Sequence, residues 1–218
     1  MSKDKNELEI RNYPALFDIR DDDNDGVVVG RPIVFDSMTD LGYFNEIIER
    51  GALDNADLRD IRLCLNHDTS YVYARSRNNN ESSTMQVTVS DDGMEIKAAL
   101  DIESSPKAQD LYSAIKRKDI DKMSFMFSVA EDKWEDLDSD HPTRHITSIA
   151  SVVEVSAVTW PAYEATEIFA RGKEALEKAR STVETARQQR KANAPEGADK
   201  NTDALALAKA KLNLITGG

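Results

Sequence analysis

Three polar residues end or interrupt apolar segments, and their side chains are those that acyl transfer requires. His67 ends the segment LCLNHD, Ser124 lies within KMSFMFSV, and Glu154 is the only charged residue of SIASVVEVSAVTW. A histidine can remove the proton of a serine hydroxyl, and a carboxylate can hold that histidine in the required tautomer. An unpaired buried carboxylate costs several kcal/mol, so Glu154 requires a donor such as a histidine N–H unless its face meets solvent. A structural histidine, a small polar strand residue and a solvent-facing glutamate are the alternatives that the pattern leaves open.

Two further histidines, His141 and His145, stand four residues apart in the segment HPTRH. On a helix this spacing could hold a metal ion, but Pro142 and the strand-like residues that follow disfavour a helix, and no cysteine pair lies nearby. We therefore expect a loop with solvated histidines. A metal-dependent hydrolase that uses His67, His141 and His145 remains an alternative. The single cysteine, Cys64, lies in the apolar run IRLCL, which predicts a buried residue rather than a reactive thiol.

The elements that would position these residues are mostly strands. In the segment with Ser124, period-two alternation puts the apolar residues from Met123 to Val129 on one face and Ser124 with Ser128 on the other. Ser105 followed by Pro106 has the chemistry of a helix start. The expected strands are 7–19, 25–35, 61–68, 83–90, 93–102, 122–130 and 146–160, and the expected helices are 43–53 and 106–119.

Charge and composition limit the partners. The net charge is −12, and such a chain should repel nucleic acid. No run approaches the roughly 18 apolar residues of a membrane helix, so we expect neither a nucleic-acid nor a membrane partner. Residues 1–166 hold all the strand patterns and are predicted to form one domain. Residues 167–193, with seven Lys/Arg against four Glu and a local charge of +3, are predicted as a helical extension, and residues 194–218 as a linker with a short final helix.

The ordered segments around the three polar residues resemble the prohead proteases of tailed bacteriophages, the capsid-maturation serine proteases. That family shows an Asn-His-Asp-like motif after an apolar strand, then a Ser-Phe-Gly-Phe-like strand, then a Glu-Val-Ser…Pro-Ala-Tyr segment. Here the matching segments are Leu65-Asn66-His67-Asp68, Met123-Ser124-Phe125-Met126-Phe127 and the run from Glu154 to Tyr163. The resemblance covers roughly residues 10–166. Met126 departs from it, because the family often has glycine there.

The resemblance implies an α+β, β-rich fold like that of the herpesvirus assembly proteases, with a closed or nearly closed β-barrel, flanking helices and, here, a C-terminal helical extension. It implies that His67 is the general base and Ser124 the nucleophile of a serine endopeptidase. Glu154 is carried over as the third member, with His145 in reserve because related viral enzymes vary at that position. Arg144 is a candidate donor to the oxyanion. No cofactor or metal is expected.

The resemblance also implies a substrate and a place. Such enzymes are packaged inside the procapsid in the host cytoplasm, where they cut scaffolding segments of the major capsid protein and often themselves. The helical extension 167–193 would then bind helical scaffold segments, or else pack as a solvated helix on its own domain. A homo-oligomer is left open. An inactive, protease-like scaffolding protein is the alternative from another functional class.

Overall fold

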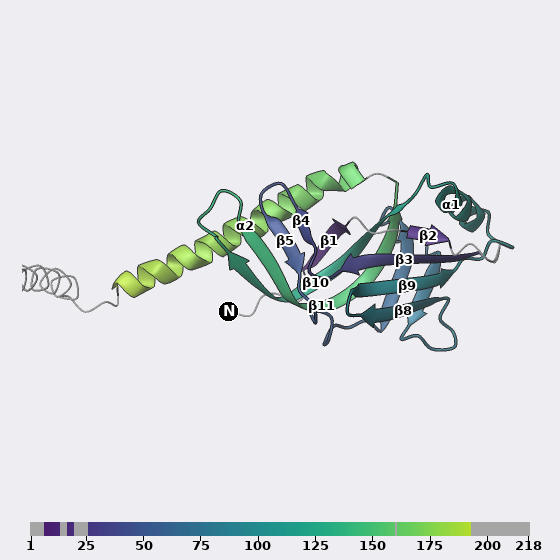
Figure 1. Cartoon of the computed structure of the whole chain (residues 1–218), viewed down its shortest axis with the longest axis horizontal. Helices are drawn as coiled ribbons and strands as arrows, with labels where there is room; N and C mark the ends of the chain where they lie inside the picture. Colours follow the sequence, from purple (N-terminus) through teal and green to yellow (C-terminus); the bar gives the residue numbers. More distant parts are fainter. Residues whose placement is uncertain (1–6, 14–16, 20–25, 160, 193–218) are drawn as a thin grey trace, which may run out of the picture. The chain divides into compact units, whose positions relative to one another are not determined.

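A computed structural model of the chain describes residues 7–13, 17–19, 26–159 and 161–192 (Figure 1). Its strands are β1 (Leu8–Tyr13), β2 (Phe17–Ile19), β3 (Val27–Val34), β4 (Met38–Asp40), β5 (Asn45–Ile48), β6 (Asp60–Leu65), β7 (Ala74–Arg77), β8 (Met85–Ser90), β9 (Gly93–Ala99), β10 (Lys122–Glu135) and β11 (Thr143–Val158), and its helices are α1 (Pro106–Lys116) and α2 (Pro161–Ala192). The fold is therefore α+β and β-rich, as predicted.

The larger sheet is built around the long antiparallel pair β10 and β11. It has seven strands in the order β1-β10-β11-β5-β4, and β6 also pairs with β11 and with β7. Strand β11 is long enough, at 16 residues, to pair with two parallel partners. Its beginning pairs with β5, and its end, from Glu154 to Ala157, pairs with β6. This arrangement puts the end of β6 beside the last residues of β11, and these lie opposite the first residues of β10.

The smaller sheet has four antiparallel strands in the order β2-β3-β9-β8. Strands β8 and β9 form the hairpin predicted around Asp91-Asp92-Gly93, with Ser90 opposite Gly93. Gly93 has a φ of 145°, and a Cβ atom there would lie 2.0 Å from the carbonyl oxygen of Ile33, so only glycine fits. A Cβ atom on Gly30 would lie 2.3 Å from the Sδ atom of Met123. Gly30 thus marks the point where the smaller sheet packs closely against β10.

Helix α1 begins and packs as its sequence predicts. Ser105 is the N-cap and accepts a hydrogen bond from the Ala108 N–H, and Pro106 occupies the first turn. The buried face consists of Ala108, Leu111, Tyr112 and Ile115, which belong to the main hydrophobic core. This core also takes in the apolar face of β10, including Phe125 and Phe127. The alternation predicted for the strand that carries Ser124 therefore has its apolar side in the core.

The prediction of a closed or nearly closed barrel is wrong. Among the described strands, the two sheets are open, and no ladder joins one to the other. The sheets bury their apolar side chains in one shared core instead, with β3 packed on β10 at Gly30. The helix expected over 43–53 is also wrong. Residues 45–48 form β5, because pairing with both β4 and β11 and the burial of alternate side chains outweigh helix propensity.

Helix α2 has 32 residues, and the chain divides into two compact units within it, residues 1–176 and 177–218. Leu176 ends the first unit and is buried in a small apolar cluster with Leu41 and Phe44. In the second unit, the described side chains are mostly exposed. The predicted linker and final helix over 194–218 lie outside the described residues. No helix in the described part of the chain has the length and apolar character needed to cross a membrane.

Candidate active site

His67 stands in a tight turn at the end of β6. The Asp68 N–H donates to the Leu65 carbonyl oxygen at 3.0 Å, and both central residues have left-handed backbone, with φ of 50° at Asn66 and 56° at His67. This is the conformation of a type I′ turn, which is uncommon for residues other than glycine, although asparagine and histidine adopt it more often than most. Such backbone costs roughly 1–3 kcal/mol per residue and persists where the surroundings impose it. The turn therefore depends on contacts that hold it in place.

Strand β11 supplies those contacts. The Asn66 N–H donates to the Ala157 carbonyl oxygen at 2.9 Å, and the Asn66 Oδ1 atom accepts from the Thr159 N–H at 2.9 Å. The His67 N–H donates to the Ser156 Oγ atom, also at 2.9 Å. The end of β11 thus fixes both residues of the turn. As a result, the imidazole of His67 meets the polar side chains of β10 and β11.

Ser124, His67 and Glu154 form one hydrogen-bonded chain. The His67 Nε2 atom lies 2.7 Å from the Ser124 Oγ atom, and its Nδ1 atom lies 2.5 Å from the Glu154 Oε2 atom. Ser156, which is two residues from Glu154 in β11, lies opposite Ser124 across the β10–β11 ladder. The side chains of Ser124, Ser156 and Glu154 therefore share one face of the sheet. The structure therefore brings together the three residues that the sequence predicts, in the order serine, histidine, carboxylate.

Glu154 is almost fully buried, with 3% of its side chain exposed, and both carboxylate oxygens have partners. Oε2 faces His67, while the Ser156 hydroxyl donates to Oε1. Ser156 thus receives the backbone N–H of His67 and gives its own proton to Glu154. This satisfies the carboxylate, so the solvent-facing alternative does not apply. Ser156 was not identified as a site residue from the sequence, although its i, i+2 spacing from Glu154 places the two residues on the same strand face.

The Ser124 hydroxyl has a second acceptor besides His67. Its Oγ atom lies 3.0 Å from the carbonyl oxygen of Arg11, in the edge strand β1. Ser124 is fully buried, and 9% of the His67 side chain is exposed. A hydroxyl has one proton to donate, so it donates either to the Arg11 carbonyl oxygen or to the Nε2 atom of His67 at a given moment.

Arg144 lies in a different part of β11. Its guanidinium binds Glu9, Glu46 and Asp132 in a buried ion cluster that also includes Arg11. Burial alone would lower the pKa of Arg144, but these carboxylates raise it. The guanidinium is therefore engaged by three carboxylates, and none of its contacts involves Ser124, His67 or Glu154. The structure gives no support to Arg144 as a donor to an oxyanion at Ser124.

The other two histidines are not part of this site. His145 faces Glu49 and Glu135, with its Nδ1 atom 3.2 Å from the Glu49 carboxylate, and it precedes Glu154 by nine positions in the same strand. It lies in β11 rather than in a loop. The exposed His141 lies 3.3 Å from the Asn45 side chain. The structure therefore does not assemble His67, His141 and His145, and among the described residues no group of three acidic, histidine or cysteine side chains could hold a metal.

Cys64 is buried one strand away from Ser156, its partner in the β6–β11 ladder. Burial, followed by the negative charge of Glu154, raises the pKa of the Cys64 thiol to about 12. A thiol with this pKa stays protonated at neutral pH and is a poor nucleophile. Cys64 is therefore a core residue, as predicted from the run IRLCL.

The fold and the site define the class. A serine, a histidine and a carboxylate, hydrogen-bonded in that order on a rigid sheet, are the arrangement of serine hydrolases. The family model of caudovirus prohead serine proteases matches residues 15–180, a range that contains all three residues. The chain belongs to the caudovirus prohead serine protease family. No curated protein and no solved structure matches it. Membership indicates a serine protease of phage capsid maturation, one that works with capsid proteins inside the procapsid of the host cell.

Proposed function

We propose that this chain is an endopeptidase that cleaves scaffolding segments of the phage major capsid protein, and itself, during procapsid maturation. In this proposal Ser124 is the nucleophile, His67 the general base and Glu154 the third member. The observation that carries it is the hydrogen-bonded chain from Ser124 Oγ through both ring nitrogens of His67 to Glu154. The family supports the reaction class, and this geometry supports the roles of the residues.

The reaction is acyl transfer in two steps. His67 Nε2 accepts the proton of Ser124 as its Oγ atom attacks the carbonyl carbon of a peptide bond. His67 then gives this proton to the leaving amine, and an ester between Ser124 and the acyl half remains. Water, deprotonated by His67, hydrolyses the ester and restores the hydroxyl. During both attacks Glu154 accepts the Nδ1–H and stabilises the imidazolium.

Ser156 would support this reaction without touching the substrate. Its hydroxyl holds one oxygen of Glu154, and its Oγ atom holds the backbone N–H of His67. The rotamer of the acid and the position of the base are therefore coupled through one side chain. We assign Ser156 a positioning role, because precise placement of the acid and base is what the transfer of a proton requires.

One observation favours a second candidate, an inactive protease-like scaffolding protein. Ser124 is fully buried, and its hydroxyl is also within hydrogen-bond distance of the Arg11 carbonyl. A scaffolding protein would keep the fold and lack turnover. The two candidates differ in whether intact Ser124 is needed for cleavage of capsid protein.

Co-expression with the cognate major capsid protein tests the proposal. We expect the intact chain to give shortened capsid protein, identified by mass spectrometry, and Ser124→Ala to give none while keeping its circular dichroism spectrum. Ser128→Ala is the matched control. Ser128 is a buried serine four residues further along β10, and its Oγ atom lies 2.8 Å from Ser151 rather than near a histidine. Cleavage that survives in Ser124→Ala, or is absent from the intact chain, would reject the peptidase assignment.

The helical extension 167–193 is proposed to deliver the enzyme to the procapsid. Seven Lys/Arg against four Glu make this extension locally basic in an otherwise acidic chain, and its described side chains beyond Leu176 are mostly exposed. A basic helix can bind an acidic helical scaffold segment. Removing residues 177–218 should therefore lower the amount of enzyme in purified procapsids, and unchanged incorporation would contradict a delivery role.

A further inference from the structure

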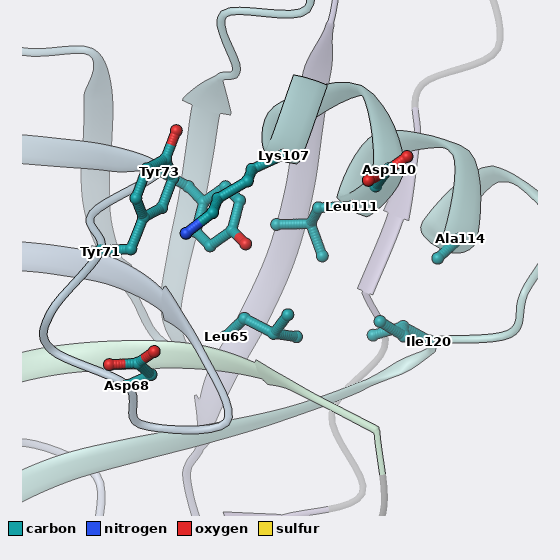
Figure 2. A pocket seen from close by; sticks show the side chains of 9 residues that line it. All are labelled: Leu65, Asp68, Tyr71, Tyr73, Lys107, Asp110, Leu111, Ala114 and Ile120. Atoms are coloured by element: carbon teal, nitrogen blue, oxygen red, sulfur yellow. The ribbon is translucent and has the colours of Figure 1, made fainter. Parts of the chain in front are cut away.

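A cavity of about 430 Å³ lies between the turn that carries His67 and helix α1 (Figure 2). Its volume is within the range of about 300–1,000 Å³ that is typical of small-ligand pockets. Figure 2 shows Leu65, Leu111 and Ile120 around the same space, with Tyr71 and Tyr73 at one end. These residues come from the turn region after β6, from α1 and from the segment ahead of β10. Neither the family assignment nor the proposed reaction accounts for this cavity.

The cavity adjoins the candidate active site. Leu65 and Asp68, which both line it, are the first and last residues of the turn that contains His67. Ile120 precedes Ser124 by four residues, a separation of at most about 14 Å along the chain. Leu65 pairs with Ala157 and so lies on the core face of the sheet, whereas Ser124 and Glu154 lie on the other face. A peptide whose carbonyl group reached Ser124 would bring one of its side chains to this cavity where the peptide passes the end of the sheet at the turn with His67.

The walls of the cavity are apolar and firmly held. Leu65, Leu111 and Ile120 provide aliphatic surface. Leu111 and Ile120 belong to the main core, and Leu65 packs against it. The Tyr71 hydroxyl lies 2.8 Å from the Ser105 hydroxyl at the start of α1, and the rings of Tyr71 and Tyr73 meet edge to face at 4.8 Å. A preformed apolar cavity of this kind binds an apolar group without first having to reorganise.

The charges at the cavity select against an acidic occupant. Asp68 and Asp110 line it together with one cation, Lys107, for a sum of −1. The Lys107 ammonium already lies 4.4 Å from the centre of the Tyr71 ring, where the face of the ring attracts it. A carboxylate side chain would meet two carboxylates and lose its water. An uncharged apolar side chain loses nothing and buries its surface.

We infer that this cavity is a specificity subsite, which takes one aliphatic or aromatic side chain of the substrate within a few residues of the scissile bond. The inference rests on the proposed peptidase function, and it names the substrate class of that same site. It assigns Ala114, which lines the cavity from α1, as a residue whose size limits the side chain that fits.

The test uses the full chain with a library of internally quenched peptides, in which each position in turn is fixed as Leu, Phe, Lys, Glu or Gly. We expect one position near the cleaved bond at which Leu or Phe exceeds Glu and Gly in kcat/KM by roughly 10-fold or more, since a well-fitted apolar pocket discriminates by that order. Peptides cleaved with no apolar preference at any position would overturn the subsite and leave the peptidase function intact.

A variant that fills the cavity gives the second arm. Ala114→Phe should lower kcat/KM for the preferred peptide by roughly 10–100-fold and change that for the Gly peptide less than about threefold. Gln109→Phe, at an exposed position of α1 outside the cavity, is the matched control and should change neither. Equal losses for both peptides in Ala114→Phe, or the same selective loss in Gln109→Phe, would overturn the subsite.

A fluorophosphonate that labels the active serine distinguishes failure of the subsite from failure of the peptidase function, because it reaches Ser124 without filling a side-chain pocket. Labelling of Ala114→Phe at the wild-type rate, with the selective loss of cleavage, supports the subsite. If Ala114→Phe does not fold, Ala114→Val and the peptide scan on the wild type decide. Absence of both labelling and cleavage in the wild type would reject the peptidase function, and the subsite with it.

Discussion

Replacing Glu154 by glutamine should disable the base through the tautomer of His67 rather than through lost charge alone. In the wild type, the Ser156 hydroxyl donates to one oxygen of Glu154, and the other oxygen accepts the Nδ1–H of His67. If Ser156 keeps donating, the amide oxygen of glutamine must face Ser156, and the NH₂ group then faces Nδ1. An Nδ1 atom that accepts a hydrogen bond from this NH₂ group carries no proton, so the ring hydrogen lies on Nε2. A protonated Nε2 atom faces Ser124 as a donor and cannot act as a base.

The expected loss is large because the wrong tautomer removes general-base catalysis. An acid-to-amide change in a serine-protease triad lowers kcat by about 10⁴, which corresponds to roughly 5 kcal/mol of transition-state free energy. We expect Glu154→Gln to lower kcat/KM by roughly 10³–10⁴-fold. The amide fills nearly the same volume in a buried site, so the thermal midpoint should change far less than the activity.

The double variant Glu154→Gln/Ser156→Ala tests directly whether the Ser156 hydroxyl orients the amide of Gln at position 154. Without the hydroxyl, the amide can turn its oxygen toward Nδ1 and restore the active tautomer. We therefore expect the double variant to be at least as active as Glu154→Gln, although Ser156→Ala alone should lose roughly 10-fold through poorer placement of His67.

Peptide hydrolysis under single-turnover conditions measures these effects, with circular dichroism to confirm folding and fluorophosphonate labelling to count reactive Ser124. Glu154→Gln that keeps more than about a tenth of the wild-type rate would show that Glu154 does not orient the base. Losses that multiply in the double variant would show that Ser156 does not select the orientation of the amide.

Three other perturbations follow from the structure. His67→Ala should lower kcat/KM by at least about 10³-fold in a folded protein, and an active His67→Ala would reject the general base. Burial alone would raise the pKa of Glu9, but the charges of Arg11 and Arg144 lower it from 4.5 to about 2. The lowered pKa means that ionised Glu9 stabilises the folded state. This contribution to the free energy of unfolding is fully present above pH 4.5 and is lost as the pH falls toward 2, by up to about 3 kcal/mol. Urea unfolding of Glu9→Gln should lack that part of the pH dependence, whereas the exposed Glu103→Gln should keep it. Truncation after residue 166 should cost roughly 2–4 kcal/mol relative to truncation after residue 176, because it removes buried Leu176; equal urea midpoints would contradict this.

Local signals explain which elements the sequence predicts well. The β8–β9 hairpin depends on alternation and on a turn with glycine, and α1 depends on a cap and an apolar stripe, so neighbouring residues determine both. Residues 45–48 differ, because their strand forms only through pairing with β4 and with β11, which lies about 100 residues further along. Single-sequence patterns do not contain such pairings. The expected barrel came instead from the family resemblance, and the pairing of the described strands leaves both sheets open.

The site divides in the same way. Residue type made His67, Ser124 and Glu154 candidates, because a lone charge in an apolar strand must find a partner or meet solvent. The resemblance to the prohead proteases then gave them catalytic rather than structural roles. The residues that hold them were not identified from the sequence. Ser156 and Asn66 act through particular hydrogen bonds to the turn, and these depend on the register of β11 against β6. A serine or asparagine in a strand or turn is too common for its type to reveal such a role.

The carbonyl of Arg11 has a consequence for timing. Since β1 lies at the sheet edge and its carbonyl competes with His67 for one hydroxyl proton, the fraction of molecules ready to react depends on an N-terminal strand. If the two hydrogen bonds were equally strong, half the molecules would be ready; an advantage of about 1.4 kcal/mol for the carbonyl would leave roughly one in ten. A protease that is enclosed with its substrate during assembly would cut less before assembly is complete if most molecules were held in the state that is not ready to react. Detachment of β1 would remove the competing carbonyl and raise that fraction at most twofold in the first case and about tenfold in the second.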